Sequence, residues 1–207
     1  MKKRTIALLM AVVMLFGATV GGTIAWLQAS TGEVVNTFTV GDINIDLKEH
    51  KYDATENDLL EKVEANETTS VDNYKIIPGT DLPKDPFVRV KAGSEACWVF
   101  VKVETEKWPT SKVTFGIDGK WTVLDATNYP DIYWYEQDTL VGETEDELLY
   151  ILADDKVEVS EDLTKTEIEV IKAAGSPKLK FTAYAVQKEN FATAKAAWDA
   201  TFGATNP

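Results

Sequence analysis

The sequence predicts a mainly β protein, a jelly-roll-like antiparallel β-sandwich with two short helices near the C-terminus. Short segments in which apolar and polar residues alternate recur along the chain, separated by glycine, proline, asparagine and aspartate. Only two later segments have the periodicity and the end signals of helices. Residues 26–207 suit a single domain, which buries roughly 70% of its unfolded surface and needs no disulfide.

The chain begins with the pattern of a signal peptide. Three basic residues precede an almost entirely apolar run that ends at Val20, and this run is shorter than the ~20 residues that span a bilayer. Small residues follow it, so we expect a signal peptidase to cut between Ala25 and Trp26 and to release a secreted protein without a permanent membrane anchor. Cleavage after Ala29 and retention of the leader as an anchor are the alternatives.

Removal of residues 1–25 makes an acidic protein more acidic. The leader takes three of the 21 Lys and Arg residues and none of the 34 Asp and Glu residues, so the net charge changes from −13 to −16. A surface this negative repels nucleic-acid phosphates and anionic lipid head groups. The composition therefore argues against nucleic acid as a partner.

The predicted strands fill the middle of the chain. Between Gly41 and Leu152 we expect them at residues 43–47, 87–91, 96–104, 113–117, 120–124, 132–137 and 147–152. Residues 49–73 are polar and acidic and predict a surface excursion. Asp118-Gly119 lies between two β-prone runs and predicts a two-residue hairpin.

Cys97 is the only cysteine, so no intrachain disulfide can form. On a strand its side chain shares a face with Val99, Val101 and Val103. We therefore expect a small buried apolar residue, and a reactive thiol is the alternative.

The C-terminal part predicts a helix, a strand and a second helix. Thr164 and Glu167 form a capping box, and Gly175 ends the first helix. One face of the last strand carries Leu179, Phe181, Ala183 and Ala185. Asn190 can cap the closing helix. Its apolar stripe, which either covers its own sandwich or docks a partner, consists of Phe191, Ala194, Trp198 and Phe202.

Three blocks of the sequence resemble one family. GGTIAWLQAS followed by NTFTVGDINIDL is similar to the glycine pair, the aromatic residue after the cleavage site and the N-T-F-x-x-G strand of the secreted TasA/camelysin proteins of Gram-positive bacteria. IIPGTDLPKDPFVRVKAGSEACWVFVKVE and FTAYAVQKENFATAKAAWDATFG resemble the family's second block and its closing strand and helix. The resemblance covers residues 18–47, 75–104 and 156–203.

The resemblance implies a jelly-roll fold, export under a dedicated, eukaryotic-like signal peptidase, and self-assembly into fibres of a biofilm matrix. In that picture the N-terminal segment of one subunit completes a sheet of the next. The segment from Trp26 to Val40 fits an assembly strand, because Gly32 gives it a hinge and strand addition needs apolar side chains. Those side chains are Trp26, Leu27, Val34, Val35, Phe38 and Val40. The alternative is that this segment is the first strand of its own sandwich.

We expect no catalytic residue, no metal site and no cofactor. Zinc hydrolases need about three protein ligands, whereas the chain has one histidine, His50, which we expect at the solvated surface. A serine triad also needs a histidine as its base. Cysteine catalysis would have to pair Cys97 with His50, and the apolar surroundings of Cys97 raise the pKa of its thiol. Calcium is an alternative ligand for the acidic clusters Glu143, Glu145, Asp146, Glu147, Asp154 and Asp155.

The sequence supports three alternative functions. The first is a secreted structural protein that polymerises into fibres. The second is a camelysin-like secreted metalloprotease. The third is a monomeric adhesion or glycan-binding module, in which Tyr133, Trp134 and Tyr135 would stack on sugars.

Overall fold

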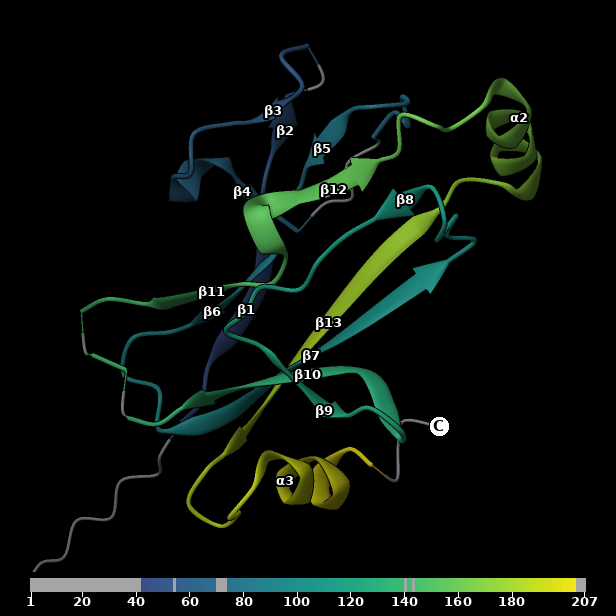
Figure 1. The fold of residues 1–207 in the computed structure, drawn as a ribbon. Coiled ribbons are helices and arrows are strands. Elements are labelled where there is room, and N and C mark those ends of the chain that lie inside the picture. The colour runs from purple at the N-terminus through teal and green to yellow at the C-terminus, as the bar shows by residue number, and fades with distance from the viewer. Residues whose placement is uncertain (1–41, 54, 70–73, 140, 143, 204–207) are drawn as a thin grey trace, which may run out of the picture. The chain divides into compact units, whose positions relative to one another are not determined.

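The computed structural model describes residues 42–53, 55–69, 74–139, 141–142 and 144–203 (Figure 1). Its strands are β1 (Ile45–His50), β2 (Tyr52–Asp53), β3 (Asp58–Leu59), β4 (Glu67–Thr68), β5 (Asp81–Pro83), β6 (Phe87–Val90), β7 (Cys97–Glu106), β8 (Val113–Thr114), β9 (Thr122–Asp125), β10 (Tyr129–Gln137), β11 (Glu147–Tyr150), β12 (Lys156–Val159) and β13 (Lys178–Gln187). Its helices are α2 (Lys165–Ala174) and α3 (Ala194–Thr201), with 3-10 turns η1 (Glu64–Asn66) and η2 (Ala153–Asp155). The mainly β fold with two helices near the C-terminus is confirmed, whereas the jelly-roll topology stays a prediction.

Two four-stranded antiparallel sheets carry the fold. The strand order is β11-β6-β1-β4 in the first sheet and β13-β7-β10-β9 in the second. A long ladder joins β13 to β7, with Lys178 opposite Glu106 and Gln187 opposite Cys97. Two smaller sheets have the orders β5-β12-β8 and β2-β3.

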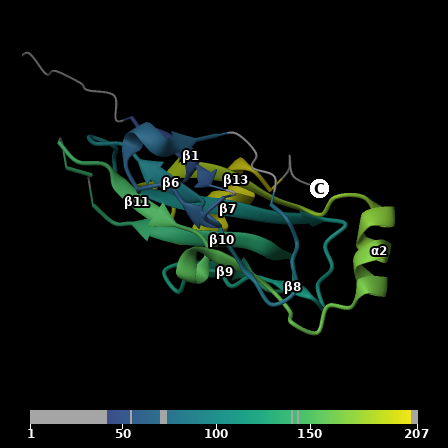
Figure 2. The ribbon, with the colours of Figure 1, turned by 90° about the horizontal axis from the view of Figure 1, so that it is seen from above.

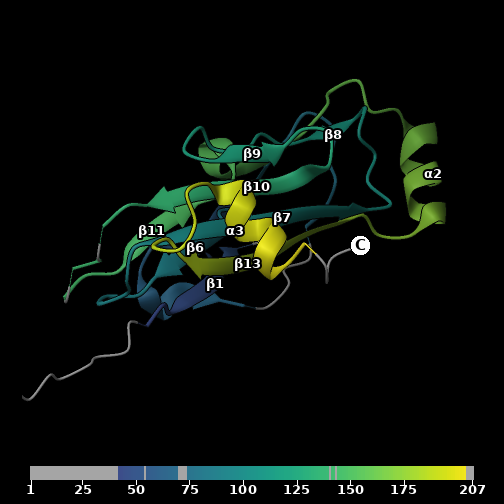
Figure 3. The same ribbon diagram turned by 90° about the horizontal axis from the view of Figure 1, so that it is seen from below.

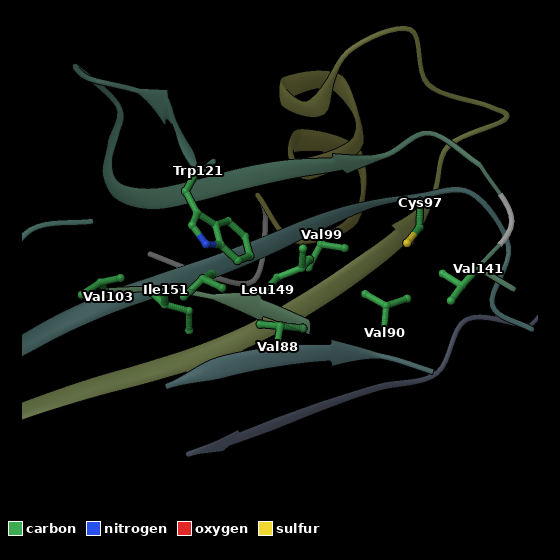
Figure 4. Close-up of a cluster of buried hydrophobic side chains, with 10 residues drawn as sticks. Val88, Val90, Cys97, Val99, Val103, Trp121, Val141, Leu149 and Ile151 are labelled. Atoms are coloured by element: carbon green, nitrogen blue, oxygen red, sulfur yellow. The ribbon is translucent and has the colours of Figure 1, made fainter. Parts of the chain in front are cut away.

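The main core lies between strands of the two large sheets (Figure 4). Val88 and Val90 point into it from β6, Leu149 points into it from β11, and Cys97 and Val99 point into it from β7. All five side chains are almost completely buried. As predicted, the face of β7 that carries Cys97 is buried, because alternate residues of a strand point to the same side.

Helix α3 covers the opposite face of the second sheet (Figure 3). There Phe100 of β7 meets Trp198 of the helix, with ring centroids 5.1 Å apart, and the Trp198 side chain is fully buried. The apolar stripe predicted for this helix packs against its own sheet, which confirms the first of the two alternatives. The N-cap prediction was wrong: Thr193, not Asn190, caps the helix, because its hydroxyl accepts a hydrogen bond from the Ala196 N–H.

Helix α2 begins and ends where the sequence predicts. The Thr164 side chain accepts a hydrogen bond from the Glu167 N–H while the Glu167 carboxylate accepts one from the Thr164 N–H, so the capping box is present. Gly175 is the C-cap with a φ of +95°, a backbone conformation that residues with a side chain rarely adopt. Ile168 and Ile171 pack the helix against the cluster around β8 and β12.

The hairpin predicted at Asp118-Gly119 was wrong. The turn exists, because the Trp121 N–H donates to the Asp118 carbonyl over 3.0 Å. However, β8 pairs with β12 and β9 pairs with β10, so the two strands beside the turn do not pair with each other. Pairing between distant segments decided this part of the fold, and no local signal reports it.

The acidic segment after β1 rejoins the first sheet. Strand β1 continues to His50, and β4 pairs with its end, with Glu49 opposite Thr68. Most of residues 55–66 are exposed, as expected of a surface excursion. We call residues 58–69 the strap, because side chains of this segment reach across β6 and β11, as described below.

Burial raises the pKa of the Cys97 thiol to about 11. The thiolate is the reactive form, so below that pH the folded protein holds Cys97 as an unreactive thiol. We expect no reaction with a disulfide reagent at pH 8 in the native protein and one thiol per chain after unfolding in denaturant. The absorbance of the released thiolate measures both, and a rapid reaction of the native protein would contradict the buried position.

Candidate functional site

Within the described residues, strand β1 has an open edge along its first half. Its ladder with β6 includes the bond from the Lys91 N–H to the Asn44 carbonyl, 2.9 Å long. Because antiparallel ladders alternate, the backbone groups of Ile45 and Leu47 point away from β6. On that side β4 pairs only with the far end of β1. Among the described residues, no strand pairs with Ile45 or Leu47 there.

Strand β13 also has an open edge. The Lys188 N–H donates to the Ala96 carbonyl over 3.0 Å, which fixes the alternation of the ladder with β7. The backbone groups of Leu179, Phe181 and Ala183 therefore point away from β7. Within the described parts of the chain, β7 is the only strand that pairs with β13.

The two open edges belong to strands that lie side by side (Figure 2). Cα atoms of β1 and β13 approach within 8 Å, but no backbone hydrogen bond between described residues joins the strands. We call this region the seam; its residues are Ile45, Leu47, Leu179, Phe181 and Ala183. Their side chains pack against the main core but are only half-buried, whereas Val88 and Val101 are fully buried.

Such a region can bind an extended polypeptide. The backbone groups of the open edges offer hydrogen-bond donors and acceptors, and the half-buried side chains offer an apolar strip. Charged pairs lie beside it: Lys91 contacts Asp46 over 2.9 Å, and Lys180 contacts Glu106 over 2.9 Å. These hydrogen bonds hold the pKa of the Asp46 and Glu106 carboxyls below the ordinary value, so both carboxyls are ionised at neutral pH.

A buried histidine–aspartate pair lies at the end of β1. The His50 Nδ1 is 2.7 Å from one Asp85 carboxylate oxygen, and the backbone N–H of His50 donates to the other oxygen over 3.0 Å. Both residues are almost completely buried. The prediction of a solvated His50 was wrong, because Asp85 and the ring of Phe87 enclose it. Among the described residues, no group of three metal-ligating side chains could hold a metal ion.

The residues considered for binding sugars or calcium have partners within the fold. Tyr133 and Tyr135 pack against the main core and Trp134 packs against the α3 side, so the predicted alternation is confirmed. Asp146 lies 3.3 Å from Arg89, and Asp155 lies 2.6 Å from Lys62. These two carboxylates of the acidic clusters are thus paired with cationic side chains.

The sites predicted at the N-terminus lie outside the described residues. They are the cleavage-site residues Ala25 and Trp26 and the assembly-strand residues Trp26, Leu27, Val34, Val35, Phe38 and Val40. In the part of the chain that the structure describes, no helix is both long and apolar enough to cross a bilayer.

The sequence predicted which faces of the seam strands are apolar but did not reveal the seam. Alternation at Ile43, Ile45 and Leu47, and at Leu179 and Phe181, correctly indicated the core side. Whether a strand lies at the edge of a sheet depends on long-range pairing, which periodicity does not encode.

Comparison of the chain with protein-family models, curated proteins and solved structures finds no match. The resemblance to the TasA/camelysin proteins therefore stays a prediction.

The open edge of β13 predicts an alternating pattern of amide hydrogen exchange. In the monomer, the amides of Leu179, Phe181 and Ala183 should exchange at least roughly tenfold faster than those of Lys180 and Thr182, which bond to β7. Residue-resolved NMR measures both sets in one sample. Equal protection of the two sets would show that this edge is covered in the monomer.

Proposed function

We propose that this is a secreted structural protein that polymerises into fibres of an extracellular matrix or cell surface. Each copy would accept the N-terminal segment of another copy in its seam. The observation that carries the proposal is the pair of neighbouring open edges with half-buried apolar side chains between them. An added strand would satisfy backbone groups and bury apolar surface at the same time.

The segment from Trp26 to Val40 has the composition that such a strand needs. In an extended conformation Val34, Phe38 and Val40 fall on one face, because side chains alternate along a strand. Its single charged residue is Glu33, so little desolvation of charge opposes insertion. In the sequence the segment directly precedes the described residues.

Donation of this strand from copy to copy gives an open assembly. The donor segment and the acceptor seam are different surfaces, so the contact is heterologous and produces filaments unless the rotation closes a ring. The resemblance to the TasA/camelysin proteins points to the same kind of assembly. Cleavage between Ala25 and Trp26 would release the donor end after export.

Deletion of Trp26 to Val35 tests the donor. The shortened protein should remain a folded β monomer and should form no filaments, because its donor strand lacks most of its apolar residues. Electron microscopy after prolonged incubation and circular dichroism measure the two properties. Filaments as abundant as those of the processed full-length protein would refute the donor role.

Proline at position 183 tests the acceptor. The Ala183 N–H points away from β7, so Ala183→Pro removes no bond of that ladder and should cost only ~1 kcal/mol of unfolding free energy. The same substitution blocks an edge donor, so fibre yield should fall at least roughly tenfold.

Ala183→Ser is the matched control, because it keeps the N–H and should polymerise normally. Chemical denaturation and sedimentation of fibres compare the three proteins. Normal fibres from a stably folded Ala183→Pro protein would exclude this edge as the acceptor.

A further inference from the structure

The strap occupies the end of the same β1 edge that forms the seam. Its strand β4 pairs with Glu49, and the ladder continues with the bond from the Lys51 N–H to the Asn66 carbonyl, 2.9 Å long. Glu49 has the same alternation as Ile45 and Leu47, so all three residues present backbone groups to one edge. The strap therefore determines where the open part of β1 stops.

Charged contacts hold the strap in place. The Glu67 side chain is 5% exposed; it pairs with Arg89 of β6 and lies 3.2 Å from the Lys48 Nζ. At the other end, the Lys62 Nζ lies 2.6 Å from Asp155 and 4.6 Å from the centre of the Tyr150 ring.

Apolar burial contributes little to the attachment of the strap. Leu60 and Val63, two of its apolar residues, are 37% and 40% exposed. Beneath it, Phe87 is fully buried and Arg89 is 5% exposed. Breaking a buried charged pair by removing one partner is strongly destabilising, so the position of the strap depends on Glu67 far more than on its apolar side chains.

We propose that the strap, held in place by its charged contacts, acts as a stop on the acceptor edge. It shortens the part of β1 with which the N-terminal strand of a second copy can pair. This inference rests on the proposed function, since it concerns the same seam. With the strap in place the open stretch of β1 is Ile45–Lys48; with the strap displaced it extends to His50. The added position, Glu49, presents one more N–H and one more carbonyl, so displacement should strengthen strand addition roughly tenfold.

A reversible cross-link tests the stop within one protein. Cysteines at Glu49 and Thr68 would lie opposite each other at a hydrogen-bonded position of the ladder, where Cα atoms are about 5.5 Å apart, within the range of disulfides. In a Cys97→Ala background, the disulfide of the oxidised Glu49→Cys/Thr68→Cys protein locks the strap, and its reduction by a thiol reagent leaves the strap held only by its charged contacts. Fibre growth should be at least several-fold faster in the reduced state than in the oxidised state.

Glu67→Gln tests, without a cross-link, whether the charged contacts of Glu67 hold the strap in place. The loss of charge should raise amide exchange roughly tenfold at Lys51, whose N–H bonds to the Asn66 carbonyl of the strap, and should shorten the lag before fibres appear. Glu169→Gln is the matched control, since Glu169 forms an exposed pair with Lys172 on α2, 2.9 Å long, and should change neither quantity.

The possible results separate the two proposals. Faster growth on reduction, together with increased exchange in Glu67→Gln, supports the stop. Equal growth of oxidised and reduced protein overturns the stop while leaving strand donation intact. The absence of fibres from the processed wild-type protein and from every variant overturns the proposed function and this inference with it.

Discussion

Strand β7 must bury both of its faces, and this constraint organises the described domain. Its odd-numbered residues from Cys97 to Val103 enter the main core, while Trp98 and Phe100 enter the cluster beneath α3. A strand buried on both sides needs a pairing partner at each edge and an apolar cover on each face. β10 and β13 supply the edges, and the first sheet and α3 supply the covers.

Because of this arrangement, the strands at the edges of the two sheets have backbone groups without a strand partner among the described residues. β13 satisfies one edge of β7, but among the described residues no strand pairs with its own second edge, and the same holds for the first half of β1 beside it. The seam side chains are only half-buried, so this side of the main core is incompletely covered. Elsewhere a charged strap shields the outer face of the first sheet, where Phe87, Arg89 and His50 are buried in spite of facing away from the main core.

Local signals predicted much of the fold. The capping box at Thr164, the glycine end of α2 and the alternation along β7 were read correctly, because each depends on residues close in sequence. The hairpin at Asp118-Gly119 failed because β8 pairs with the distant β12 instead: Thr114 lies opposite Glu158, 44 residues later in the chain. His50 failed for a similar reason: Asp85, which buries and bonds it, lies 35 residues away. The seam could not be predicted at all, since it is defined by which strand edges have no partner within the described parts of the chain.

The ladder between β13 and β7 has a mechanical consequence. Its ten residue pairs run parallel to the long axis of both strands. A pulling force applied along β13 would load these backbone hydrogen bonds together, in shear, whereas a force across the ladder would open them one after another. If a neighbour's N-terminal strand continued this sheet, as proposed, tension along a filament would load the new ladder and the β13–β7 ladder in series, and the donor strand would resist extraction without any covalent bond.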